Sequence, residues 1–84
     1  MFLCAILKNL KTQILARVDP YYKGMRIHVM SSITFLLMYE DYVIYEVTRN
    51  GDKLDCVYED TGRAFTGLTV EEFMERLVEE GYCA

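Results

Sequence analysis

Apolar and aromatic side chains are densest in the middle of the chain, over residues 33–48, ITFLLMYEDYVIYEVT. β-Branched and aromatic residues dominate this stretch, and such side chains fit the pleated surface of a sheet better than a helix. The adjacent acids Glu40 and Asp41 interrupt it, and the whole run is too short to cross a membrane. We therefore expect two strands, Ile33–Tyr39 and Tyr42–Thr48, joined by a turn at this acidic pair.

The N-terminal segment has apolar side chains at the three- and four-residue spacing of an amphipathic helix. The predicted helix covers Phe2–Val18 and ends at Asp19-Pro20, because a residue that precedes proline is pushed out of the helical region. The following segment, Met25–Met30, has the two-residue period of a strand.

Asn50-Gly51 predicts a tight hairpin directly after the central stretch. Both residues tolerate the positive φ that a two-residue type I′ turn requires. This turn would pair Thr48 with Lys53 across the two strands. The same register sets Glu46 opposite Asp55, and this like-charge pair opposes it.

The last third of the chain contains a turn, a short strand and a helix. The turn is expected at Asp60–Arg63, with a return strand at Ala64-Phe65. Thr69–Glu72 has the sequence of a capping box, in which each side chain caps the other residue's backbone N–H. A helix over Val70–Glu80 follows, and Gly81 supplies its left-handed end.

These elements predict a single α+β domain over residues 1–84. We expect an antiparallel β-meander of three to four strands flanked by an N-terminal and a C-terminal helix, in the order α-β-β-β-β-α, with both helices on one face. The hydrophobic content of 52% is that of a folded domain, and the single proline and five glycines leave no linker.

Charge is distributed unevenly over the two halves of the chain. Residues 1–42 carry five Lys and Arg against three acids, whereas residues 43–84 carry four against ten, and the net charge is −4. An acidic balance disfavours binding to a phosphate backbone and suits a basic protein surface. We expect a protein partner with a basic surface, no direct contact with nucleic acid and no membrane partner.

The three cysteines Cys4, Cys56 and Cys83 match neither a disulfide framework nor a zinc-binding pattern. A Cys4–Cys83 disulfide would require the two helices to be neighbours, and a metal site would have to combine these thiols with His28. The N-terminus lacks a basic segment before its apolar residues, so we expect no signal peptide. The expected location is the reducing cytoplasm.

Two features of the sequence are candidate catalytic sites. Asp60-Thr61-Gly62 has the triplet of aspartic proteases, but a glutamate precedes it and the second apolar half of that motif is missing, so a turn fits better. His28 is the only histidine, and no activated nucleophile or orienting acid accompanies it. We expect no enzyme and no catalytic, cofactor-binding or metal-binding residue.

Carboxylates on the C-terminal helix and the hairpins form the predicted docking surface for the partner. Glu71, Glu75 and Glu79 repeat at four-residue spacing, although like charges at this spacing destabilise a helix. A solvated face that serves only solubility is the alternative interpretation. The candidate docking residues are Glu71, Glu72, Glu75, Glu79, Glu80, Asp52, Asp55, Glu59 and Asp60.

The second face of the predicted sheet is also apolar. If both helices cover the opposite face, this one would be exposed over a larger area than monomers usually tolerate. The alternative function is therefore a structural or regulatory protein that forms a homodimer through this face. Its candidate residues are Met30, Leu36, Met38, Tyr42, Ile44 and Val57.

The whole chain resembles phage-encoded anti-CRISPR proteins in its element order and acidity. The similarity covers ILKNLKTQIL, the Asn50-Gly51 hairpin and TVEEFMERLVEEG, and includes no diagnostic motif. It implies a small inhibitor or adaptor. Some members of that class mimic nucleic acid and occupy the basic site where a nuclease reads DNA. No functional residue can be transferred from a likeness of this kind.

Overall fold

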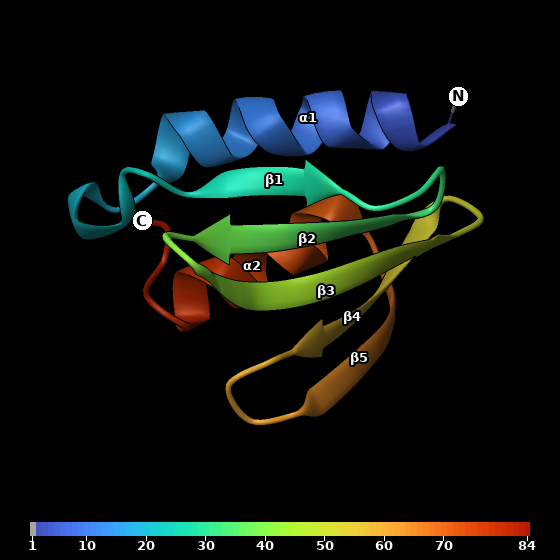
Figure 1. Ribbon diagram of the computed structural model, residues 1–84. Coiled ribbons are helices and arrows are strands. Elements are labelled where there is room, and N and C mark those ends of the chain that lie inside the picture. Colours follow the sequence, from blue (N-terminus) through green and yellow to red (C-terminus); the bar gives the residue numbers. More distant parts are fainter. Residues whose placement is uncertain (1) are drawn as a thin grey trace.

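The computed structural model describes residues 2–84, with side chains from Ala5 onward. Two α-helices and a short 3₁₀-helix accompany a five-stranded sheet (Figure 1). The helices are α1 (Phe2–Arg17), η1 (Pro20–Tyr22) and α2 (Val70–Glu79), and the strands are β1 (Arg26–Val29), β2 (Thr34–Tyr39), β3 (Tyr42–Asn50), β4 (Lys53–Tyr58) and β5 (Arg63–Leu68).

The five strands form one antiparallel meander in the order β1-β2-β3-β4-β5. This confirms the predicted α+β class and antiparallel sheet. The β2–β3 and β4–β5 connections lie at one end of the sheet, and the β1–β2 and β3–β4 connections lie at the other (Figure 1). Residues that flank the β2–β3 and β4–β5 turns are therefore brought to the same end of the molecule.

The predicted strand number was wrong, because β5 is a full strand. The sequence suggested a return strand of only two residues, whereas β5 spans Arg63–Leu68 and pairs with β4 on both sides of an irregularity. Gly67 lies inside β5 with φ of 68°, a conformation that glycine adopts without steric cost. Gly67 lies in the part of β5 where the register of the β4–β5 pairing shifts.

The β3–β4 hairpin has a different register from the predicted one. Asn50 pairs with Lys53, and Gly51 is the first of the two turn residues, with φ of 67°. Glycine in that position suits a type II′ turn. The two-residue shift keeps the same side chains on the buried face but places Glu46 opposite Val57. It thereby removes the like-charge pair that opposed the predicted register.

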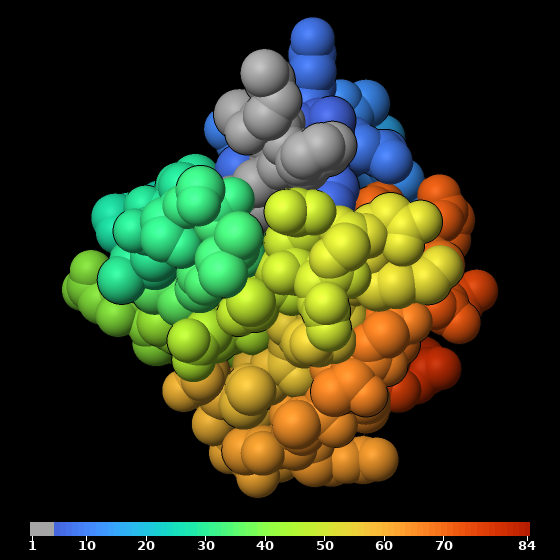
Figure 2. Space-filling view, turned by 90° about the vertical axis from the view of Figure 1, so that its right-hand side faces the viewer, coloured from blue at the N-terminus to red at the C-terminus, as the bar shows by residue number. Residues whose placement is uncertain are grey.

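Both helices pack their apolar sides into one core on the same side of the sheet. α2 lies behind the strands, and α1 runs along the β1 edge above it (Figures 1 and 2). The core combines Leu7, Leu10 and Ile14 of α1 with Phe73, Met74 and Leu77 of α2 and with Phe35, Leu37, Tyr45, Val47, Leu54 and Cys56 of the sheet. Neither helix is long and apolar enough, over its described residues, to span a membrane.

α2 begins and ends as its sequence predicts. Thr69 Oγ1 accepts from Glu72 N at 3.1 Å, and Thr69 N donates to Glu72 Oε1 at 2.8 Å, which confirms the capping box. Gly81 follows the helix with φ of 87°. The chain then reaches the end of α1, where Cys83 forms an isolated bridge with Val18. This attachment fixes the position of Tyr82.

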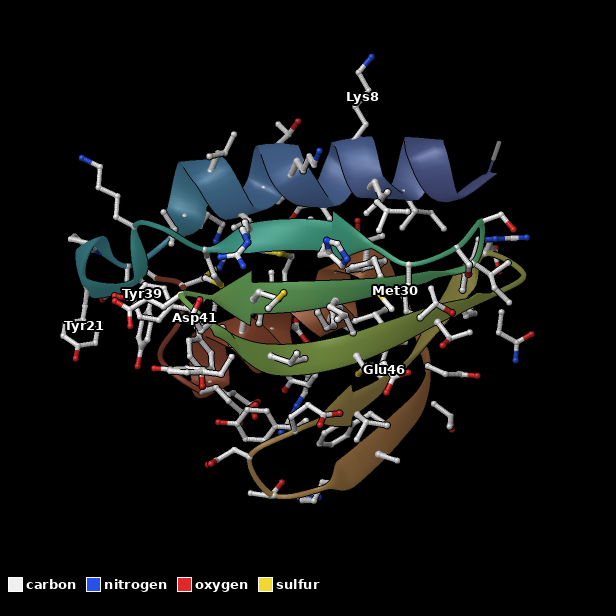
Figure 3. The ribbon with its side chains drawn as sticks, viewed as in Figure 1. Lys8, Tyr21, Met30, Tyr39, Asp41 and Glu46 are labelled. Carbon is white, nitrogen blue, oxygen red and sulfur yellow. The ribbon has the colours of Figure 1, made fainter. Side chains whose placement is uncertain are left out.

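The face of the sheet opposite the helices carries no helix (Figures 1 and 3). Met30 and Tyr42 are more than half exposed there, and Leu36, Met38 and Val57 are half-buried. Ile44 was also predicted on this face, but only 2% of it is exposed. The register shift between Leu37 and Met38 makes Ile44 the extra residue of a bulge in β3, and it joins the core.

Candidate functional site

Tyrosines gather at the end of the sheet that carries the β2–β3 turn. Tyr39 and Tyr42 flank this turn, with ring centres 6.1 Å apart. η1 places Tyr22 against Tyr39 at 5.1 Å, and Tyr21 stacks edge-on against Tyr22 at 4.9 Å. Edge-to-face pairs at such distances are favourable beyond the area that they bury.

A second branch of contacts leads from Tyr22 into the core. Its ring lies 4.6 Å from that of Tyr82, whose hydroxyl is 3.2 Å from the hydroxyl of Tyr58. Tyr58 in turn lies 5.0 Å from Tyr45, which is fully buried. The seven tyrosines of the chain are thus connected through ring and hydroxyl contacts, and we call them the tyrosine cluster.

Burial raises the pKa of two tyrosines on the inner side of this cluster, Tyr45 and Tyr82. Desolvation, followed by a hydrogen bond to Glu80, raises the pKa of Tyr45. Desolvation and the hydrogen bond with Tyr58 likewise raise the pKa of Tyr82. These two phenols therefore carry no charge at physiological pH, and the charge of this end of the molecule comes from the acids around the cluster.

A shallow cleft of about 440 Å³ opens beside these rings. Its walls are Tyr42, Tyr58 and Tyr82, with Glu59 and Asp60 at the start of the β4–β5 turn and the β3 residues Val43 and Ile44 between them. No lysine or arginine is among the residues that line it, as far as the described residues show. We call it the tyrosine cleft.

The acids beside the tyrosine cleft face solvent. Glu59 and Asp60 are exposed and form no ion pair with another described side chain. Glu40 and Asp41, at the β2–β3 turn of the same end, are exposed as well (Asp41 is labelled in Figure 3). The turn predicted at Asp60–Arg63 is present, with Gly62 at φ of 73°, and Arg63 is already the first residue of β5.

Glu40 adopts a strained backbone conformation within this site. Its φ is 54°, and it is the only residue other than glycine with positive φ among the described residues. The turn is held by Arg26, whose Nη1 donates to the Glu40 carbonyl at 2.7 Å. A glutamate here costs stability that a glycine would not, and such outliers often occur at functional sites.

The carboxylates predicted on α2 differ in their surroundings. Glu71 and Glu75 are exposed, and Glu72 is exposed but caps the helix. Glu79 is 66% exposed and pairs with Arg76 at 2.9 Å. α2 therefore has an acidic outer stripe, as predicted, although one of its three members already has a cation beside it.

Glu80 does not belong to that outer surface. Its side chain is only 18% exposed, accepts a 2.7 Å hydrogen bond from the hydroxyl of Tyr45 and lies 3.5 Å from Nη2 of Arg76. Glu80 keeps helical dihedral angles and follows the buried Leu77 by three residues, so it lies on the face of α2 that meets the sheet. Glu80 is therefore part of the internal polar contacts between α2 and β3.

The two remaining predicted acids lie along the β3–β4 hairpin, away from the tyrosine cleft. Asp52 is exposed in the turn at the opposite end of the sheet. Asp55 is half-buried, and its Oδ1 accepts from Gly67 N at 2.9 Å, which helps to hold β5 against β4. Of the nine predicted acids, only Glu59 and Asp60 line the tyrosine cleft.

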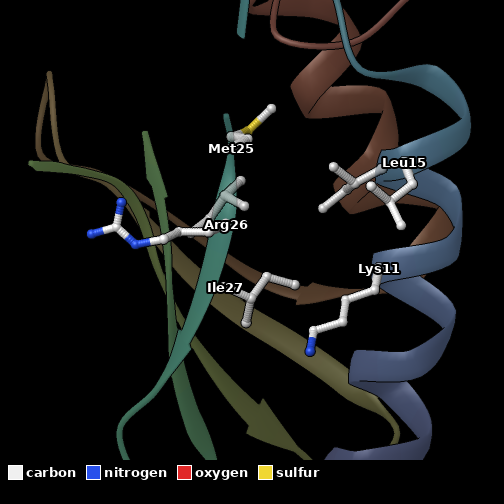
Figure 4. A pocket seen from close by; sticks show the side chains of 7 residues that line it. Lys11, Leu15, Met25, Arg26 and Ile27 are labelled. Atoms are coloured by element: carbon white, nitrogen blue, oxygen red, sulfur yellow. The ribbon is translucent and has the colours of Figure 1, made fainter. Parts of the chain in front are cut away.

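A second hollow of about 250 Å³ lies between α1 and β1 (Figure 4). Its lining is mainly apolar, from Ile14 and Leu15 of α1 to Ile27 of β1. Lys11 reaches across its mouth, whereas Arg26 points away from α1 (Figure 4). No carboxylate lines this hollow, whereas Glu59 and Asp60 line the tyrosine cleft, so of these two concave surfaces the tyrosine cleft is the one with negative charge.

The described residues show neither a disulfide nor a metal-binding group. Cys56 and Cys83 are buried free thiols, and burial raises the pKa of both, that of Cys56 to about 11. The side chain of Cys4, and with it a Cys4–Cys83 contact, lies outside the described residues. No group of three or more His, Cys, Asp or Glu among them is arranged to hold a metal ion.

No protein family, no curated protein and no solved structure matches this chain. Its function must therefore be inferred from the surfaces themselves.

Proposed function

We propose that this protein is a small, non-enzymatic binding protein, an inhibitor or adaptor, that docks on a basic protein surface. The observation that carries this proposal is the tyrosine cleft, where Glu59 and Asp60 face solvent beside the exposed ring of Tyr42. Tyrosine is enriched at protein interfaces because its rigid ring contributes a large contact area and its hydroxyl still forms hydrogen bonds.

The charge of the protein supports the same proposal. The net charge is −4, and four exposed acids, Glu40, Asp41, Glu59 and Asp60, lie at the two turns of the cleft end. A negative surface accelerates encounter with a basic one by steering, and this acceleration fades as salt increases. In the class suggested by the resemblance above, the basic surface would be the nucleic-acid site of another protein.

The strained turn at Glu40 is a second support. A glycine at this position would relieve the unfavourable φ of 54°, yet the chain places an acidic side chain there. A carboxylate kept at some cost to stability, at the same end of the sheet as the tyrosine cleft, agrees with a role in binding.

The proposal is tested by capturing partners from an extract of the organism that encodes the protein. The baits are the natural chain, E59K/D60K at the tyrosine cleft and E71K/E75K on the outer stripe of α2. Each double reversal changes the net charge from −4 to 0, so the two variants differ only in where the charge is changed. Thermal unfolding of each bait checks that it is folded.

We expect the natural chain and E71K/E75K to retain a basic protein that E59K/D60K loses. Retention of the same proteins by all three baits would contradict the proposal. If only E71K/E75K failed to capture the basic protein, the docking surface would be the outer stripe of α2 instead of the tyrosine cleft.

Self-association through the open face of the sheet is the competing proposal. The exposure of Met30 and Tyr42 favours it, but Glu46 is exposed between Leu36 and Val57, its cross-strand neighbours (Figure 3). A charge in the middle of an apolar face opposes close packing of a second copy. Sedimentation at micromolar concentration decides between the two, since a strict monomer excludes the homodimer.

A further inference from the structure

The tyrosine cleft has the chemistry of a site for a positively charged side chain. Aromatic faces attract cations, and the carboxylates of Glu59 and Asp60 add charge and hydrogen-bond acceptors. Arg63, the basic residue closest in sequence, does not line the cleft. Its guanidinium lies 5.2 Å from the centre of the Phe65 ring instead.

The protein already holds one of its own arginines in this way. The guanidinium of Arg76 lies 4.2 Å from the centre of the Phe65 ring, and Nη1 donates to Glu79 at 2.9 Å. Nη2 lies 3.5 Å from Glu80. The guanidinium of Arg76 therefore lies against an aromatic ring and beside two carboxylates, and the tyrosine cleft offers the same kinds of group without an arginine.

An arginine suits the tyrosine cleft better than a lysine does. Its planar guanidinium stacks on aromatic rings, and its several N–H groups can bond two carboxylate oxygens at once. Tyr42 is 58% exposed, which leaves it open to such stacking, while Glu59 and Asp60 are adjacent in the chain and can accept together. A lysine ammonium is more strongly hydrated and has no plane to stack.

We infer that the tyrosine cleft receives one arginine side chain of the partner, stacked on Tyr42 and bonded to Glu59 and Asp60. This inference rests on the proposed function, because it identifies the group that the basic partner inserts. Arginine would then be the anchor of the interface, with the surrounding acids acting mainly on the rate of encounter.

The test uses short peptides and does not need the partner. Blocked Gly-Gly-Arg-Gly-Gly, its lysine counterpart and its citrulline counterpart are titrated into the full chain at low salt. Backbone amide shifts in NMR spectra locate the site. Citrulline has nearly the shape of arginine without its charge, so it reports contacts that do not depend on the cation.

We expect the arginine peptide to shift the amides around Tyr42, Glu59 and Tyr82, with citrulline at least about 10-fold weaker. Tyr42→Leu should weaken binding about 2- to 5-fold, the usual contribution of one cation–π contact. Tyr42→Phe keeps the ring face and should change affinity less than about 2-fold. E59Q/D60N, which keeps the shape of both side chains, should weaken binding about 10-fold.

Three results would overturn the inference. They are equal binding of the lysine peptide, shifts confined to the Glu71–Glu75 stripe of α2, and unchanged affinity in both Tyr42→Leu and E59Q/D60N. None of these three results contradicts the proposed function, provided that the natural chain still captures a basic partner and E59K/D60K does not. The proposed function fails separately, when no basic protein is captured.

Discussion

The hydroxyl of Tyr45 donates a 2.7 Å hydrogen bond to Oε1 of Glu80, and this bond joins the centre of the sheet to the end of α2. Tyr45 is fully buried, and the Glu80 side chain is 18% exposed. A carboxylate at the C-terminus of a helix interacts unfavourably with the helix dipole, and this hydrogen bond offsets that cost for Glu80.

Replacing Tyr45 by phenylalanine removes this hydrogen bond and keeps the packing of the ring. We expect the free energy of unfolding to fall by about 1.5–3 kcal/mol, the usual contribution of a hydrogen bond to a charged group. Urea unfolding of the natural chain and the variant measures the change. The control is Tyr21→Phe, at a residue that is 74% exposed, which should change the free energy of unfolding by less than about 0.5 kcal/mol. Equal destabilisation by the two substitutions would contradict a stabilising Tyr45–Glu80 hydrogen bond.

The raised pKa values of Tyr45 and Tyr82 predict a loss of stability at alkaline pH. The folded protein holds these two protons to a higher pH than the unfolded chain, in which a tyrosine titrates near its ordinary value of 10.0. The contribution is therefore constant below about pH 10 and falls as the pH rises above it. Urea unfolding at pH 8, 9.5 and 11 measures this fall, and it should be smaller in Tyr45→Phe.

The positive φ of Glu40 predicts a stabilising substitution. Glu40→Gly removes the strain of the left-handed conformation, about 1–2 kcal/mol, but glycine loses more backbone conformational entropy on folding. We therefore expect the free energy of unfolding to rise by about 0.5–1 kcal/mol. Asp41→Gly, at the next residue, has no such strain to relieve and should lower stability by about 0.5–1 kcal/mol. Thermal unfolding compares the two, and a loss in Glu40→Gly would show that the turn is not strained.

The thiol of Cys56 should be unreactive in the folded protein. It is 2% exposed, and burial raises its pKa to about 11. Ionisation alone then lowers its thiolate fraction at pH 8 about 100-fold relative to an unperturbed thiol. A Cys4→Ser variant isolates the two buried cysteines for iodoacetamide labelling. Rapid labelling without denaturant would contradict this placement, and labelling in guanidinium is the control for completeness.

The helices and central strands could be predicted because each has a strong local signal. The capping box at Thr69–Glu72 and the glycine at residue 81 fixed both ends of α2 to within one residue. β5 was underestimated because its sequence, RAFTGL, has no regular alternation of apolar and polar residues and contains a glycine. Its pairing depends on contacts with β4, such as the bond from Gly67 to Asp55, which a local pattern does not reveal.

The candidate site was only partly predictable, since it depends on which strand ends meet. Glu59 and Asp60 were predicted as docking residues, but Tyr58 and Tyr82 were not. The available signal was the number of tyrosines, seven in 84 residues, several of them next to predicted turns. Their assembly requires the meander, η1 and the attachment of the C-terminus to α1, so the structure was needed to reveal it.

The most direct test of the central claim is the dissociation constant of the captured, purified partner for the natural chain and for E59Q/D60N. The constants are measured by calorimetry at about 50 mM and about 500 mM NaCl, because charges are screened only weakly at the lower concentration and strongly at the higher one. We predict at least about 10-fold weaker binding by E59Q/D60N at low salt, and a smaller difference between the two proteins at high salt. Equal affinity of the two proteins at low salt would contradict the claim that the partner is bound at this cleft.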